Sequence, residues 1–259
     1  MDTGPASYDT LAAVYDWLVP EPMLTPEGAV EAFAAVVDTL HPGARVLDCA
    51  AGTGQLAVGL ALRGHEVVAS DASAAMVERA RALAAAHGVD VPAVVCAWEA
   101  LEDQGWRDVF DVVFCVGNSI VHAGPPARRR AALAAMAHVL RDGGLLVVTS
   151  RNWELVRNRG SGIRVADRLI ERDGGHGLVI YDWTVPEDAE QALCVDVAVA
   201  RVAGDGAVTT SAERLECWPF THEQLDADLR AAGLTPRSST YRAGAERYLI
   251  TARRGTGRG

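Results

Sequence analysis

The chain has 259 residues, of which 49% are apolar, and a formal net charge of −10. This length and apolar fraction can bury the core of one α/β domain together with an elaboration. The negative charge argues against nucleic acid or an anionic membrane as the main partner. The strongest basic feature is the run Arg128–Arg130. It opens a predicted helix without interleaved aromatic residues, so we interpret it as a solvated helix face.

The cysteines indicate a reduced protein. They occur singly, without a C-x-x-C pair, and most fall in predicted strands, where a thiol serves as a small apolar side chain. We therefore expect neither a disulfide framework nor a metal site. The chain shows no signal-peptide pattern and no apolar run of membrane length, so we expect a soluble, cytoplasmic protein. The five positions are Cys49, Cys96, Cys115, Cys194 and Cys217.

Strand and helix patterns alternate through the first 150 residues. Strands are expected at 45–49, 66–70, 92–96, 110–116 and 144–150, and helices at 27–40, 54–63, 74–87 and 127–140. Ser73 is placed to cap the third helix, and Gly88 to end it. This alternation predicts a Rossmann-like α/β fold with a doubly wound, mostly parallel sheet. Ligands of such sheets collect at the carboxyl ends of the strands.

The pattern changes after Arg151. Four β-rich runs follow, at 163–171, 177–184, 193–202 and 208–218, separated by turn signals. They predict an antiparallel, β-rich insertion that covers the mouth of the site. A capping box at Thr221 and Gln224 then starts a helix that reaches about Ala232. Two final strands, at about 234–241 and 246–253, are expected to form a hairpin at the sheet edge.

These boundaries divide the chain into four parts. Residues 1–26 are expected to form an N-terminal lid, and residues 27–150 the cofactor-binding core. Residues 151–218 form the insertion over the substrate. Residues 219–254 return to the core sheet.

The most informative motif is Asp48-x-Ala50-x-Gly52-x-Gly54, followed by Asp71 at the end of the next apolar run. The motif joins a predicted strand to a predicted helix through a turn of small residues. A strand, a glycine turn and a helix place a ligand against the backbone at a helix N-terminus.

The charge of the turn indicates which ligand it holds. Gly52, Gly54 and Ala57 also match the dinucleotide fingerprint, with Asp71 as its ribose acid. Asp48, however, lies at the mouth of the turn, where its carboxylate would repel a pyrophosphate. A ligand with positive charge and no phosphate suits the turn better. We therefore favour S-adenosylmethionine, whose ribose diol Asp71 can bind. An ordinary turn capped by a buried Asp48 remains the alternative.

The order of these elements, together with the motif and Asp71, resembles the class I S-adenosylmethionine-dependent methyltransferases. Three further runs resemble the glycine N-methyltransferase group, namely Cys115–His122, Ser150–Trp153 and Tyr181–Val185. The layout and the β-rich insertion also resemble the amino-sugar N-methyltransferases of antibiotic pathways.

The resemblance implies a set of cofactor contacts. Trp98 would stack on the adenine ring, although a core tryptophan is the alternative. Tyr8 and Tyr15 lie in a segment similar to the family's N-terminal lid, where a tyrosine hydroxyl meets the methionine carboxylate or the substrate. Seven residues apart, they share one helical face, so packing against the core is the alternative. The expected cofactor-binding residues are Tyr15, Asp48, Ala50, Gly52, Gly54, Asp71, Ala72, Met76, Ala97, Trp98 and Cys115.

The resemblance also implies an acceptor site, formed by Tyr8, Asn118, Arg151 and Trp183. Asn118 stands where methyltransferases of nucleobases or glutamine amides carry Asn-Pro-Pro-Tyr, which this chain lacks. Asn118 would orient an amine, or shape a turn. His122 would act as a base or ligand contact, or serve a structural role. Arg151 would bind a substrate carboxylate bidentately, with a surface ion pair as the alternative. The expected catalytic residues are Asn118, Tyr8 and His122.

We therefore expect a methyltransferase that uses S-adenosylmethionine, releases S-adenosylhomocysteine and needs no metal. The expected acceptor is an amine of a small molecule, in natural-product (antibiotic) biosynthesis. Glycine or sarcosine is the alternative acceptor. O-methylation, and a protein that binds the cofactor without transferring its methyl group, are the alternative activities. Neither nucleic acid nor membrane is expected as a partner, and a homo-oligomer stays open.

Overall fold

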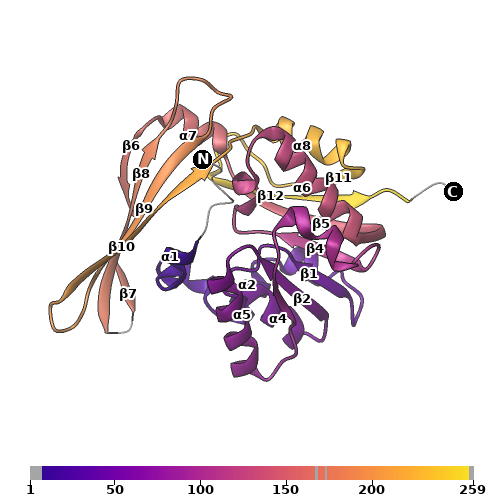
Figure 1. Cartoon of the computed structure of the whole chain (residues 1–259), viewed down its shortest axis with the longest axis horizontal. Coiled ribbons are helices and arrows are strands. Elements are labelled where there is room, and N and C mark those ends of the chain that lie inside the picture. Colours follow the sequence, from indigo (N-terminus) through magenta and orange to yellow (C-terminus); the bar gives the residue numbers. More distant parts are fainter. Residues whose placement is uncertain (1–7, 167–168, 173, 257–259) are drawn as a thin grey trace.

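The computed structural model describes residues 8–166, 169–172 and 174–256. Two sheets organise these residues, a seven-stranded sheet covered by helices and a separate five-stranded antiparallel sheet beside it (Figure 1). The larger sheet forms the core of the fold, and the smaller one stands over one end of it. This arrangement matches the predicted α/β core and antiparallel insertion.

The core sheet has the strand order β11-β12-β5-β4-β1-β2-β3. Strands β1 to β5 run parallel to one another, whereas β12 is antiparallel to both β5 and β11. The order reverses between β1 and β4, which is where ligands bind in doubly wound sheets. The bounds are β1 Arg45–Asp48, β2 Glu66–Asp71, β3 Ala93–Val95, β4 Phe110–Cys115, β5 Leu140–Arg151, β11 Leu234–Ser239 and β12 Arg247–Arg254.

The helix caps predicted from the sequence form in the structure. Ser73 accepts a hydrogen bond from the Met76 backbone N–H at 3.2 Å, and Gly88 ends the same helix in the left-handed conformation. Thr221 and Gln224 form both halves of the capping box. No helix among the described residues is long and apolar enough to cross a membrane. The bounds are α4 Gln55–Leu62, α5 Ala74–His87, α6 Pro126–Val139 and α8 His222–Ala231.

The prediction of one helix over 27–40 is wrong. The segment forms two short helices, α2 (Pro26–Glu31) and α3 (Ala34–Val37). Phe33 separates them with φ −118°, outside the helical range, and its ring packs edge-on against Phe114 of β4 at 5.7 Å. A contact with the sheet therefore decides the backbone where the helical spacing alone predicts continuity.

The smaller sheet has the order β10-β9-β8-β6, with β7 also paired to β8. The single strand predicted at 163–171 is two strands, which pair with opposite ends of β8. A helix before them, α7 (Trp153–Arg159), was missed; the Asn152 side chain caps it by accepting from the Leu155 N–H. The bounds are β6 Gly162–Val165, β7 Ile170–Arg172, β8 Gly175–Thr184, β9 Leu193–Val202 and β10 Val208–Cys217.

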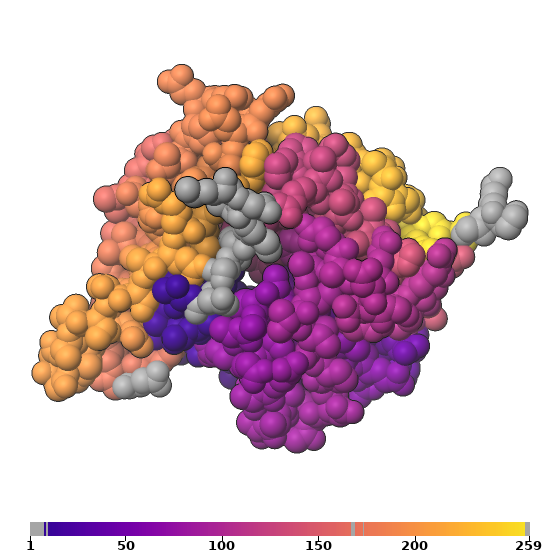
Figure 2. Space-filling model, in the orientation of Figure 1, coloured from indigo at the N-terminus to yellow at the C-terminus, as the bar shows by residue number. Residues whose placement is uncertain are grey.

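The N-terminal strap, defined here as residues 8–19, lies between the two sheets and contains α1 (Asp9–Ala12). Figure 2 shows it in indigo, wedged between the orange strands and the magenta core. Its Leu11 N–H donates to Glu213 of β10 at 3.1 Å. Trp17 lies flat on Gly177 of β8, where a Cβ atom would approach the indole to 2.2 Å. Residues 1–7 of the predicted lid lie outside the described residues.

Candidate active site

Glycine is present at the two positions of the motif for different structural reasons. Gly54 begins α4 with φ +90°, and a Cβ there would lie 2.8 Å from the Ala80 Cβ of α5. Gly54 therefore permits α4 and α5 to pack closely. Gly52 has φ +53° and faces the ring of Tyr15, which a Cβ would meet at 3.7 Å. The space would accept a Cβ atom at this distance, so the positive φ is what favours glycine at position 52.

Asp71 at the end of β2 holds this turn in shape. One carboxylate oxygen accepts from the Gly52 backbone N–H and the other from the Ser73 backbone N–H, both at 2.9 Å. Each carboxylate oxygen has a second lone pair and can also accept from a hydroxyl group. Asp71 can therefore shape the glycine turn and bind the ribose diol that the sequence predicts for it.

Asp48 carries a buried charge that lacks a full set of partners. The residue is 1% exposed, and its Oδ1 atom has no hydrogen-bond partner among the described residues. Burial raises the pKa of its carboxyl to about 7; the Ala50 backbone N–H opposes this rise, and the charge of Asp71 adds to it. An unsatisfied carboxylate at this position suits a cationic ligand group. The ammonium of S-adenosylmethionine fits that requirement, and a pyrophosphate does not.

Three cavities meet at the carboxyl ends of the strands. The first is bordered by Asp71, Ala72, Ala97 and Trp98. Trp98 is fixed in its wall because its indole N–H donates to the Cys49 carbonyl at 2.7 Å. This cavity has the lining residues expected for the adenosine part of the cofactor.

The second and third cavities lie on either side of Tyr15. The third, of about 500 Å³, follows the glycine turn and includes Asp48 and Gly52 in its lining. The second, of about 630 Å³, extends under the antiparallel sheet to Trp183. Tyr15 and Gly117 border both of these cavities. The second cavity therefore adjoins the one expected to hold the methionine part of the cofactor.

Tyr8 and His122 form a hydrogen-bonded pair in the wall shared by the first and second cavities. The Tyr8 hydroxyl lies 2.9 Å from His122 Nε2, and His122 Nδ1 lies 2.9 Å from the Glu216 carbonyl oxygen. Because a carbonyl only accepts, Nδ1 carries the proton and Nε2 accepts from Tyr8. Burial lowers the pKa of His122, which favours this neutral ring, and raises the pKa of Tyr8.

Asn118 and Arg151 lie together in the second cavity. Asn118 adopts φ +71°, and its side-chain oxygen accepts from the Arg151 backbone N–H at 2.7 Å. The oxygen expected to orient an amine is therefore engaged in holding the loop after β4 against β5. The Arg151 guanidinium lies 5.6 Å from the ring centre of Trp183. It forms no ion pair with any described residue, so the alternative role of Arg151 in a surface ion pair finds no support.

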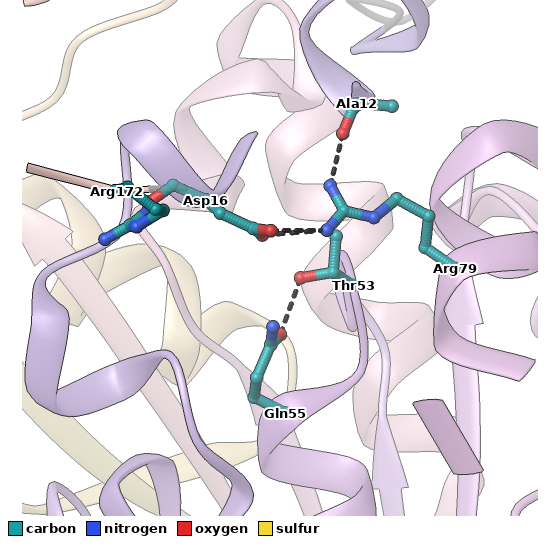
Figure 3. A network of polar contacts seen from close by, with 6 residues as sticks. All are labelled: Ala12, Asp16, Thr53, Gln55, Arg79 and Arg172. Carbon is teal, nitrogen blue, oxygen red and sulfur yellow. Dashed lines mark hydrogen bonds and ion pairs between the residues drawn. The ribbon is translucent and has the colours of Figure 1, made fainter. Parts of the chain in front are cut away.

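Polar contacts anchor the N-terminal strap over the glycine turn (Figure 3). Arg79 of α5 donates to both carboxylate oxygens of Asp16 at 2.8 Å, and to the Ala12 carbonyl. Arg172 of β7 donates to the Asp16 backbone oxygen and stacks on Trp17 at 5.5 Å. The strap is thus fixed both to the core and to the antiparallel sheet.

Most of the predicted site residues border one of the three cavities. Three of the predicted cofactor contacts do not: Gly54, which packs on α5, and Met76 and Cys115, which are at most 2% exposed. Arg247 of β12 borders the second cavity and was missed. An arginine in a predicted edge strand looks like a surface residue without a role, and Arg247 is indeed exposed. Only its pairing opposite Arg151 reveals its position.

Comparisons with known proteins agree with this geometry. A methyltransferase domain model matches residues 46–144. The glycine N-methyltransferase of Oryctolagus cuniculus is 30% identical over 208 residues, which cover 74% of this chain and 70% of that protein. The glycine/sarcosine N-methyltransferase of Parasynechococcus marenigrum is 35% identical over 127 residues, 48% of this chain and 44% of that protein. The chain spans less than half the length of this relative and of two others of its type.

Solved structures share the whole fold. The CcbJ methyltransferase of Streptomyces caelestis has a TM-score of 0.76 at 23% identity, covering 98% of this chain and 100% of its own. The sugar N-methyltransferase KedS8 of Streptoalloteichus has a TM-score of 0.71 at 24% identity, with coverages of 98% and 95%. The motif, the sheet order, the unsatisfied Asp48 and these similarities lead to one conclusion. The chain belongs to the class I S-adenosylmethionine-dependent methyltransferases.

Proposed function

We propose that this protein transfers the methyl group of S-adenosylmethionine to an amine of a small molecule, with S-adenosylhomocysteine as the second product. The observation that carries the proposal is the second cavity. It adjoins the cavities assigned to the cofactor, shares Tyr8 and His122 with one of them, and is bordered on one side by the N-terminal strap. Apolar and aromatic side chains line it together with a few polar groups, as is usual for a small-molecule site.

Three side chains would hold the cofactor. Asp48 would pair with the ammonium group, Asp71 would accept from the ribose hydroxyls, and Trp98 would stack against the adenine ring. When bound, the cofactor supplies a methyl group on a sulfonium, so the N–C bond forms as the C–S bond breaks and its electron pair stays on sulfur. The protein then contributes mainly positioning, for which effective molarities of about 10⁵ M or more are known.

The pair of Tyr8 and His122 would prepare the amine. An ammonium has no lone pair and must lose a proton before it attacks. The Tyr8 hydroxyl donates to His122 Nε2, which leaves the Tyr8 oxygen free to accept from an N–H of the substrate. A proton can then pass from the ammonium to Tyr8 as Tyr8 passes its own to His122. The contact of His122 with the Glu216 carbonyl supports the required tautomer.

For the acceptor we favour an amine in natural-product biosynthesis, of the kind found in antibiotic pathways. The support is the near-complete overlap with the fold of KedS8, a sugar N-methyltransferase. Glycine or sarcosine is the second candidate, favoured by the glycine N-methyltransferase relatives. The chain's net charge of −10 favours either over nucleic acid or membrane as the partner.

The test is release of S-adenosylhomocysteine from a panel of acceptors, followed by mass spectrometry of the products. The panel holds glycine, sarcosine, amino sugars, matched alcohols, and DNA, RNA and histone-like peptides. We expect release with small amines, and fragments that place the added mass on nitrogen. Gly52→Val serves as the control, because we expect this variant not to bind the cofactor. Transfer to nucleic acid, or cofactor binding without release from any amine, would refute the proposal.

A further inference from the structure

Two arginines face each other in the second cavity. Arg247 of β12 is the register partner of Arg151 of β5, and both border the cavity. No aspartate or glutamate is among the described residues that border it. A chain with a net charge of −10 thus presents two positive charges at the place where the acceptor is expected.

Within the described part of the chain, neither guanidinium has an ion-pair partner. The nearest carboxylate in sequence, Glu246, is paired with Arg159 instead, and Glu154 accepts from the Tyr241 hydroxyl. Burial lowers the pKa of Arg151, and the charge of Arg247 lowers it further; Glu246 opposes the effect from a distance. Like charges directly opposite each other in a sheet are destabilising. An anion between these two side chains would relieve that repulsion.

The surroundings restrict how the Arg151 guanidinium can move. Its backbone N–H is held by Asn118, and its guanidinium packs over Trp183, with Arg164 over the same ring at 5.8 Å. A guanidinium held in a fixed plane presents paired N–H donors that match the two oxygens of a carboxylate or phosphate. The Tyr8 and His122 pair lines the same cavity, so one small molecule can contact both groups.

The family resemblance already implies that Arg151 binds a substrate carboxylate. We infer that Arg247 is a second anion contact, so that the carboxylate or phosphate of an anionic amine bridges Arg151 and Arg247 while the amine nitrogen lies against Tyr8. Arg247 is then a specificity-determining residue. The inference rests on the proposed function, because it assigns this cavity to the acceptor. It also restricts the acceptor class, since a neutral sugar amine would leave the half-buried guanidinium of Arg151, and the exposed one of Arg247 beside it, without an anionic partner.

Calorimetric titration of the full chain, loaded with S-adenosylhomocysteine, tests the inference. The probes are sarcosine for a carboxylate, glucosamine 6-phosphate for a phosphate, and glucosamine as the amine without an anion. We expect at least one anionic probe to bind well above glucosamine, and Arg247→Met to weaken it by roughly tenfold to hundredfold, the range for lost hydrogen bonds between charged groups. Arg253→Met, at the other end of β12, is the matched control and should bind like the wild type.

Thermal unfolding gives a readout that does not depend on activity. Inorganic phosphate or acetate should raise the melting temperature of the wild type and of Arg253→Met more than that of Arg247→Met. Without ligand, Arg247→Met should melt no lower than the wild type, because the repulsion with Arg151 is gone. Equal affinity of glucosamine and the anionic probes, or unchanged binding by Arg247→Met, would overturn the inference.

These outcomes separate the two proposals. If neutral amines are methylated and Arg247→Met changes nothing, the proposed function stands and the anionic acceptor is wrong. If an anionic probe binds through Arg247 but no amine is methylated, the anion site stands and the proposed function is wrong.

Discussion

The buried carboxylate of Asp48 gives a prediction with opposite effects on stability and on binding. Its carboxyl titrates near 3.8 in the unfolded chain and at about 7 in the folded protein. Between these values the folded state holds a proton that the unfolded state has lost. The free energy of unfolding therefore falls as the pH rises from about 4 to about 7. Above pH 7 the folded protein carries the whole cost of a buried ionised carboxylate.

The substitution Asp48→Asn removes this titration and keeps the size of the side chain. From pH 5 to pH 8 the free energy of unfolding of the wild type falls by about 3 kcal/mol through Asp48. Each pH unit between 5 and the folded pKa of about 7 lowers it by about 1.4 kcal/mol, and little is lost above that pKa. The variant should escape that loss. Urea unfolding of wild type, Asp48→Asn and the exposed control Asp90→Asn, at both pH values and without ligand, measures the difference.

The same substitution should weaken S-adenosylmethionine binding at pH 8. The wild type then presents a carboxylate to the ammonium of the cofactor, and the amide of the variant cannot pair with it. We expect a loss of about 1.5–3 kcal/mol, the range for a hydrogen bond between charged groups. A stability difference that does not change between pH 5 and pH 8 would refute the argument from burial. Unchanged cofactor affinity would refute the assignment of Asp48 to the ammonium.

Gly52→Val should abolish cofactor binding in calorimetry, because φ +53° is strained for a β-branched residue and Tyr15 stands opposite; binding like the wild type would contradict the assigned turn. Arg79→Met should speed S-adenosylhomocysteine release by roughly threefold to tenfold in stopped-flow measurements, because the strap loses its ion pair with Asp16; an unchanged rate would show that the strap does not limit release. Arg151→Met should lower kcat/KM for an anionic acceptor by the equivalent of about 2–5 kcal/mol of transition-state stabilisation, with cofactor affinity kept; unaltered kinetics would exclude a contact between Arg151 and the acceptor. Tyr8→Phe should lower kcat and flatten the pH profile of the reaction, and a profile like that of the wild type would remove the proton relay.

Local rules made part of this fold predictable. The small residues that allow the glycine turn are next to one another in the sequence, although Asp71 holds the turn from 19 residues away, and the caps at Ser73 and Thr221 act within three residues. The parallel sheet follows from the alternation of strands and helices over the first 150 residues. Each of these features is decided by neighbours along the chain, so the sequence alone carries the necessary information.

Contacts between distant segments were not predictable in the same way. Arg247 reaches the second cavity only because β12 inserts between β5 and β11, and no local pattern indicates that insertion. The Asn118 oxygen is engaged by the backbone of Arg151, 33 residues away. The helix expected over 27–40 is divided at Phe33, which packs against Phe114. In each case, tertiary packing decides what the side chain does.

The position of the N-terminal strap has a consequence for the order of events. Tyr8 and Tyr15 are parts of the walls on which all three cavities depend, and the strap that carries them is tied to helix α5 of the core and to the antiparallel sheet. A strap displaced far enough to admit the cofactor no longer encloses the acceptor cavity. We therefore expect the cofactor to enter first, the acceptor to find its binding site only after the strap has returned, and S-adenosylhomocysteine to leave last.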